Sequence, residues 1–114
     1  MKILDKEITQ AEMFGSAEVL FDGEMVKGVV DIAQGLVAVD AELHADLEKL
    51  LLENGSKQEN LWGVNFWKDA DTVEDFIEFD SMINIRPRQG NRSRYVENEE
   101  SRKKIIEVVK KWVK

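Results

Sequence analysis

Residues 83–94 read Ile83-Asn84-Ile85-Arg86-Pro87-Arg88-Gln89-Gly90-Asn91-Arg92-Ser93-Arg94 and connect the last predicted strand to the last predicted helix. Pro87 removes a backbone donor and biases Arg86 away from helical geometry, so regular strand pairing is expected to stop there. Gly90 and Asn91 then favour a turn, because both residues tolerate positive φ. The segment is therefore predicted to be a short irregular loop.

This loop presents several cationic side chains: Arg86, Arg88, Arg92 and Arg94. Guanidinium groups are planar forks that suit carboxylate or phosphate groups, which predicts an anion site. The alternative is that the arginines pair with carboxylates of the same chain, because charged runs are usually solvated faces.

The length and composition predict one α+β domain over residues 1–114, with 43% hydrophobic and 34% charged residues. The sequence contains no cysteine, which excludes disulfides and thiolate metal sites. No apolar run approaches the roughly 20 residues that a membrane helix needs, and the first residues do not resemble a secretory signal. We therefore expect a cytoplasmic protein that does not bind membranes.

The net charge of −7 is unevenly distributed. Residues 86–114 carry a net charge of +6, whereas residues 1–85 carry −13. An acidic body argues against general binding of nucleic acid. The distribution still permits a local basic site, or head-to-tail association of acidic and basic surfaces.

The secondary-structure signals predict an N-terminal helix followed by the order ββαββα. Thr9 and Glu12 have the spacing of a capping box, and Asn98 is the expected N-cap of the last helix. The predicted elements are a helix from Thr9 to about residue 22, strands over 24–32 and 36–39, a helix over 41–54, strands over 61–67 and 76–86, and a helix after Asn98. The simplest packing is a four-stranded, mainly antiparallel sheet with helices packed on one face.

One face of this sheet would then remain uncovered and carry polar side chains around a tryptophan. These residues are Lys27, Asp31, Asn65, Trp67, Glu78, Asp80, Asn84 and Arg86. Such a surface is typical of a ligand-binding face or a dimer interface.

His44 is the only histidine and lies between Glu42 and Asp46. On a strand the three side chains would share one side and resemble a metal site, but on the predicted helix they spread around the axis. An ordinary hydrogen bond is therefore favoured over a role of His44 as ligand or general base. Glu78 and Asp80 fit either an acid–base pair or a ladder of structural ion pairs, and the ladder is favoured.

Three segments carry a family resemblance: residues 35–46, 56–65 and 81–93. Over nearly its whole length the chain resembles a family of small bacterial and archaeal proteins known only as a domain of unknown function. The resemblance implies a stand-alone prokaryotic protein and supplies no activity, cofactor or catalytic residue. Its polar motif residues also favour His44 lying near Arg86.

The sequence hypothesis is that the protein binds a small anionic, phosphate-bearing ligand. Its ligand-binding residues are Arg86, Arg88 and Arg92, which would hold the anion, Asn65 and Asn84, which would orient it, and His44 and Glu42. Catalysis, a catalytic residue and a cofactor stay unassigned, and no metal site is predicted. The alternative is a homo-oligomeric interaction module, such as a homodimer, whose open sheet face is a protein–protein interface. RNA binding is the least expected function.

Overall fold

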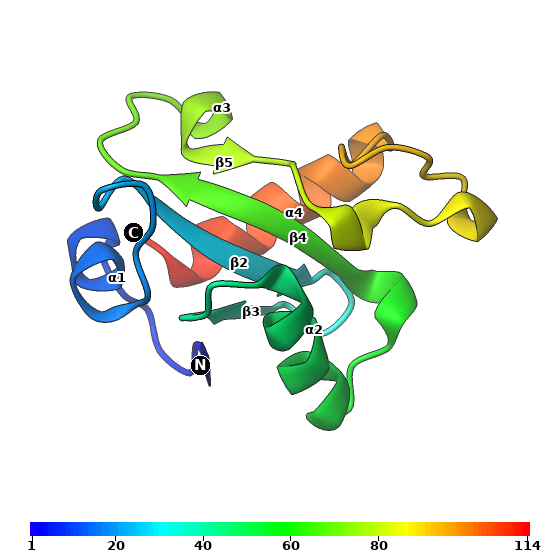
Figure 1. Ribbon diagram of the computed structural model, residues 1–114, viewed down its shortest axis with the longest axis horizontal. Helices are drawn as coiled ribbons and strands as arrows, with labels where there is room; N and C mark the ends of the chain where they lie inside the picture. The colour runs from blue at the N-terminus through cyan, green and yellow to red at the C-terminus, as the bar shows by residue number, and fades with distance from the viewer.

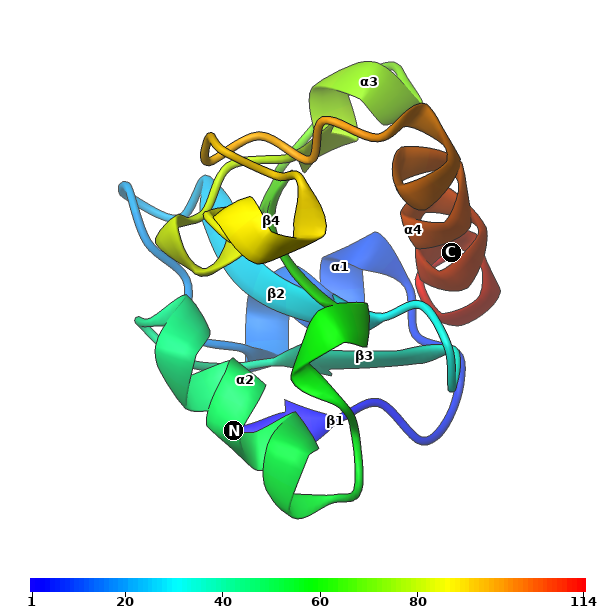
Figure 2. The same ribbon diagram turned by 90° about the vertical axis from the view of Figure 1, so that its right-hand side faces the viewer.

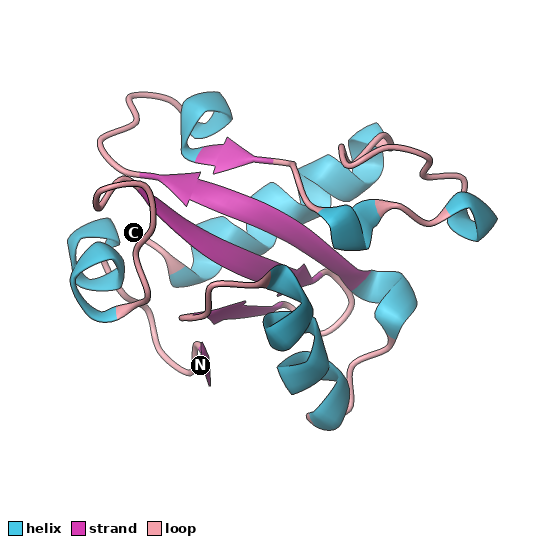
Figure 3. Cartoon of the chain, viewed as in Figure 1, coloured by secondary structure: helices cyan, strands magenta, loops and turns pink.

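A five-stranded antiparallel sheet with the order β1-β3-β2-β4-β5 organises the computed structural model, which describes residues 1–114 (Figure 1). The strands are β1 (Lys2–Ile3), β2 (Met25–Asp31), β3 (Leu36–Val39), β4 (Leu61–Trp67) and β5 (Ile77–Glu78). The helices are α1 (Gln10–Ser16), α2 (His44–Glu53), α3 (Val73–Phe76) and α4 (Glu99–Trp112), with 3-10 turns at Gln58–Asn60, Met82–Asn84 and Pro87–Gln89 (Figure 3). None of the helices is both long enough and apolar enough to cross a bilayer.

The sheet is covered on both faces, with α4 on one side and α2 on the other (Figure 2). Val26 and Val30 of β2 belong to the core cluster that contains Ile105 of α4, whereas Val29 packs with Leu47 of α2. Successive side chains of a strand point to opposite faces, so β2 is buried on both. The prediction that the helices pack on one face is therefore wrong.

The start of the chain also differs from the prediction, because strand β1 precedes the first helix. Ile3 of β1 pairs with Ala38 of β3, which makes five strands and not four. A two-residue strand is too short to show any periodicity in sequence. The capping box is confirmed, since the Thr9 hydroxyl accepts the Glu12 N–H at 3.0 Å. The helix ends at Ser16, well before residue 22.

The predicted strand over residues 76–86 is wrong except at its first residues. Helix α3, capped by the hydroxyl of Thr72, ends at Phe76, and strand β5 covers only two residues. The hydroxyl of Ser81 then accepts the Ile83 N–H at 3.3 Å and starts a 3-10 turn in place of a continued strand. Local bonds from serine side chains compete with sheet pairing in this way.

Residues 81–94, called the edge segment here, pack along the edge of β4 through side-chain bonds. Asn84 bonds both backbone groups of Gly63, and the Arg86 guanidinium donates to the carbonyl oxygens of Leu61 and Gln58. The Asn91 amide donates to three backbone carbonyls, including that of Asn84 at 2.7 Å. Polar side chains thus satisfy backbone groups that a neighbouring strand would otherwise satisfy.

Candidate functional site

A cavity of about 460 Å³ opens on the α2 face of the sheet, and we call it the His44 cavity. Its floor is formed by Met25 and Lys27 of β2 and by Asn65 and Trp67 of β4. Asn65 and Trp67 lie an even number of residues after Leu61 along β4, so all three side chains point to the same face of the sheet. Leu61 packs against α2 on that face. The cavity therefore occupies the part of this face that α2 leaves uncovered.

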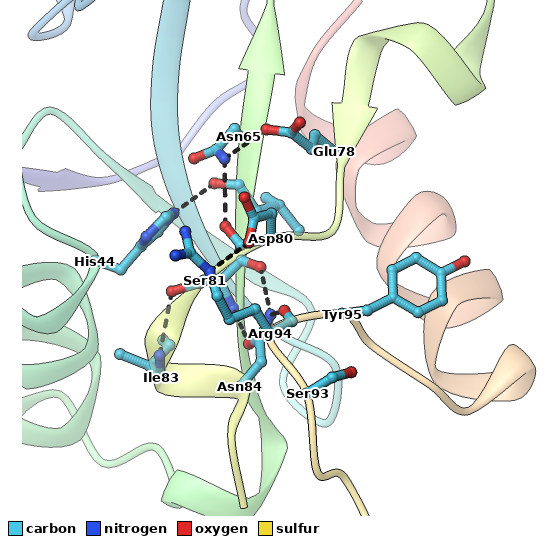
Figure 4. A network of polar contacts seen from close by, with 12 residues as sticks. His44, Asn65, Glu78, Asp80, Ser81, Ile83, Asn84, Ser93, Arg94 and Tyr95 are labelled. Carbon is cyan, nitrogen blue, oxygen red and sulfur yellow. Dashed lines mark hydrogen bonds and ion pairs between the residues drawn. The ribbon is translucent and has the colours of Figure 1, made fainter.

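His44, the first residue of α2, forms one wall of the cavity (Figure 4). Its Nε2 lies 2.8 Å from the carbonyl oxygen of Val64. A carbonyl can only accept, so Nε2 carries the proton and Nδ1 keeps the lone pair. Burial lowers the pKa of His44, with Lys27 and Arg94 acting in the same direction and the Val64 bond and Asp80 opposing them. At neutral pH the ring is therefore uncharged and has one unused acceptor nitrogen.

Asn65 on the floor is almost fully buried, with 5% of its surface exposed. Its Nδ2 donates to Glu78 Oε1 at 2.8 Å and to the backbone oxygen of Asp80 at 3.2 Å. These bonds fix the orientation of the amide, and Figure 4 shows its oxygen turned away from Glu78. Asn65 Oδ1 is buried and has no hydrogen-bond partner. An unpaired buried acceptor costs about 1–3 kcal/mol, so this atom favours a bound donor.

Asp80 and Arg94 form an ion pair at the cavity, with 2.6 Å between Asp80 Oδ1 and Arg94 Nε. Both side chains are about half exposed. The two Nη groups of Arg94 and the second carboxylate oxygen of Asp80 form no hydrogen bond with the protein. Exposed ion pairs contribute about 0–1 kcal/mol, so a ligand can engage either partner at little cost.

Lys27 supplies a second cation on the floor and lies opposite Asn65 in the β2–β4 register. Directly opposed residues have Cβ atoms about 4.5–5.5 Å apart, which places the lysine stem beside the Asn65 amide. Lys27 is half-buried and forms no ion pair within the protein. Its ammonium group is therefore free to bind a ligand.

The mouth of the cavity is apolar and exposed: Phe21, Leu43 and Met82 line it with 67%, 57% and 65% of their surfaces accessible. The ring of Phe21 stacks on that of Trp67, with 6.1 Å between centroids. Phe21 adopts a φ of 53°, a left-handed conformation that is unfavourable for a bulky residue. Strained residues of this kind occur most often at functional sites.

A larger, more open hollow of about 970 Å³ adjoins the His44 cavity and shares the Asp80–Arg94 pair with it. Its basic residue Arg102 already donates to the carbonyl oxygens of Val96 and Glu97 and stacks on Tyr95. The hollow contains no orphaned buried polar atom. Lys27, which has no ion pair, and Asn65, with its orphaned Oδ1, line only the smaller cavity, which we regard as the candidate site.

Of the residues that the sequence hypothesis named, only His44 and Asn65 meet in this cavity. Arg86 is buried and bonded to carbonyl oxygens, and burial lowers its pKa. Asn84 is likewise fully buried in backbone contacts. The arginine that shares a cavity with His44 is Arg94, whereas Arg86 does not line it.

The remaining predicted residues lie elsewhere on the surface. Arg88, Arg92 and Glu42 are exposed and do not line the His44 cavity. Glu42 and Asp46 both face solvent while His44 points inward, so the triplet does not assemble. No group of three or more His, Cys, Asp or Glu side chains is placed to hold a metal ion.

Much of the predicted open face does line the cavity, namely Lys27, Asn65, Trp67, Glu78 and Asp80. The sequence reasoning missed Phe21, Leu43 and Met82. Strand alternation could find the floor residues, but nothing in the sequence around Phe21 indicates that its ring would reach Trp67. Arg94 was noted only as a member of the arginine loop.

Comparison with known proteins supplies a family and no function. Residues 2–112 match the model of a family described as protein of unknown function, DUF5674. No curated protein and no solved structure matches the chain. The family match covers almost the whole sequence, so the chain belongs to the DUF5674 family.

Proposed function

We propose that the protein binds a small organic ligand in the His44 cavity and holds it by an anionic group. The observation that carries this proposal is that several polar groups without a partner in the protein belong to residues that line one cavity. Asn65 Oδ1 is buried without a partner, Lys27 has no ion pair, and both Nη groups of Arg94 are free. Small-molecule sites typically combine an apolar mouth with a few convergent polar groups in a volume of roughly 300–1,000 Å³.

The proposal keeps two ligand contacts of the sequence hypothesis and assigns anion binding to different cations. His44 and Asn65 keep their places as ligand contacts, and Lys27 and Arg94 replace Arg86 as the cations. Arg86 already donates to carbonyl oxygens along β4, so its donors are occupied. The neutral His44 ring offers Nδ1 as an acceptor for a hydroxyl or amine of the ligand.

Thermal-shift measurements followed by calorimetry test this proposal with phenylacetate, phenyl phosphate and L-phenylalanine. At least one compound is expected to raise the melting temperature, and Lys27→Gln and Arg94→Gln are each expected to weaken binding about tenfold or more. Lys49→Gln and Arg88→Gln are the matched controls, because both residues are exposed and lie outside the cavity. The proposal fails if no compound binds, or if the cavity variants bind as tightly as the controls.

A second candidate function is association with another copy of the chain through the cavity mouth. The observation that favours it is the cluster of exposed apolar side chains at Phe21, Leu43 and Met82. Such patches on soluble proteins mark protein contacts as well as ligand grooves. Analytical ultracentrifugation over a concentration series would show a dimer that Met82→Ser weakens. A monomer at every concentration would rule this function out.

A further inference from the structure

The charges of the His44 cavity are balanced, which a site for a simple anion would not require. Two cations, Lys27 and Arg94, line the cavity together with two carboxylates, Glu78 and Asp80. A carboxylate beside a bound anion repels it. The two acids therefore disfavour a ligand that carries negative charge alone.

The acidic and amide residues of the cavity present several acceptors. The Asn65 amide donates to the Glu78 carboxylate at Oε1 and to the backbone oxygen of Asp80 (Figure 4). Asn65, with its orphaned Oδ1, lines the same cavity, as do Glu78 and Asp80, whose second carboxylate oxygens accept no bond from the protein. An ammonium group carries three N–H donors and no acceptor, which matches this set.

The two basic residues of the cavity present donors. Lys27 and the two Nη groups of Arg94 have no other partners, and a carboxylate accepts from such donors with charge-assisted bonds. At the mouth, Phe21, Leu43 and Met82 offer apolar surface that water covers in the free protein. Burying an apolar group of a ligand there removes this surface from water, which favours binding.

From this arrangement we infer that the ligand is a zwitterion of the α-amino acid type with an apolar side chain. The inference rests on the proposed function and narrows its ligand class. The ammonium group binds Asn65 Oδ1 and the carboxylates of Glu78 and Asp80. The carboxylate binds Lys27 and Arg94, and the side chain lies against Phe21 at the mouth.

Calorimetry at neutral pH tests the inference with four related compounds. L-phenylalanine carries all three features, N-acetyl-L-phenylalanine lacks the ammonium group, L-phenylalaninamide lacks the carboxylate, and glycine lacks the side chain. L-phenylalanine is expected to bind tightest, and each of the other three at least tenfold more weakly.

Two isosteric variants separate the role of the acids from that of the cations. Glu78→Gln and Asp80→Asn are expected to weaken L-phenylalanine binding about tenfold and to leave N-acetyl-L-phenylalanine unchanged or tighter, because they remove negative charge only. Glu53→Gln is the matched control on the exposed end of α2. Circular dichroism of each variant checks that it is folded.

Three outcomes would overturn the inference that the ligand is a zwitterion. If N-acetyl-L-phenylalanine binds within threefold of L-phenylalanine, the inference is overturned while binding through an anion stands. If none of the four compounds binds but phenylacetate or phenyl phosphate does, the inference fails alone. If none of these compounds binds, both the inference and the proposed function fall.

Discussion

The side chain of Asn84 takes the place of a neighbouring strand along Gly63. The Gly63 N–H donates to Asn84 Oδ1 at 2.8 Å, and Asn84 Nδ2 donates back to the Gly63 carbonyl at 3.0 Å. The same Nδ2 donates to the backbone oxygen of Arg94 at 2.9 Å. One amide thus completes the edge of β4 and holds the segment that brings Arg94 to the His44 cavity.

Replacing Asn84 with alanine is therefore expected to destabilise the protein by about 2–4 kcal/mol, because buried backbone groups of Gly63 and Arg94 lose their partners. Urea denaturation measures the change in the free energy of unfolding. Asn54→Ala, at the exposed end of α2, is the matched control and should stay within about 0.5 kcal/mol of wild type. A loss smaller than that of the control would contradict the role of Asn84.

Gly63 is required because the edge segment lies directly against it. A Cβ atom at this position would lie 2.5 Å from the Ser81 Cβ. Gly63→Ala should cost about 1–3 kcal/mol, and Ser81→Gly in the same chain should recover part of the loss. Gly15→Ala is the control, since nothing lies within 4 Å of a Cβ there and the helix should gain about 0.5–1 kcal/mol. Strict additivity of the Gly63 and Ser81 changes would contradict this contact.

The left-handed conformation of Phe21 predicts that substitutions at this position affect stability and ligand binding differently. Phe21→Gly removes the strain and Phe21→Ala retains it, so the glycine variant should be about 1 kcal/mol more stable than the alanine variant. Both variants lose the ring that stacks on Trp67 and should bind L-phenylalanine more weakly than wild type. Thermal unfolding and calorimetry measure the two effects. Equal stability of the two variants would show that position 21 is not strained.

Burial of His44 predicts a loss of stability in mild acid. Its pKa in the folded protein lies below the unfolded value of about 6.5, so the unfolded chain binds the proton first as the pH falls. The contribution of neutral His44 is complete above about pH 6.5 and is lost as the pH falls towards the folded pKa. His44 is the only histidine. The unfolding free energy of His44→Gln should therefore fall less between pH 7.5 and pH 5.5 than that of the wild type. An unchanged difference in the variant would contradict a buried, neutral ring.

Local sequence signals predicted the elements whose causes are local. The Thr9–Glu12 capping box, the Asn98 cap and strand β4 over 61–67 all appear in the structure. The alternation of β4 also placed Asn65 and Trp67 correctly on one face, which is now the cavity floor. Capping and pleating depend on neighbours in sequence, so they can be predicted from it.

The errors concern the edge segment, where a local serine turn and contacts between residues distant in sequence replace the predicted strand. Residues 76–86 alternate like a strand, yet the Ser81 hydroxyl starts a turn and Arg86 reaches the carbonyl oxygen of Gln58. An arginine is expected to seek carboxylates, and no local pattern shows that backbone oxygens will occupy it first. The convergence of His44, Asn65 and Arg94 depends in the same way on how the edge segment docks.

A proton–nitrogen correlation NMR titration with L-phenylalanine would locate the bound ligand, and the three tryptophan indoles provide an internal comparison. Trp67 Nε1 donates to Glu78 on the cavity floor, whereas Trp112 Nε1 donates to the Gly35 carbonyl far from the cavity. Ligand binding in the His44 cavity predicts that the Trp67 indole and the Asn65 side-chain amide shift together while the Trp112 indole does not. Shifts centred on Arg88 and Arg92, or saturable binding that leaves Trp67 and Asn65 unshifted, would contradict the site.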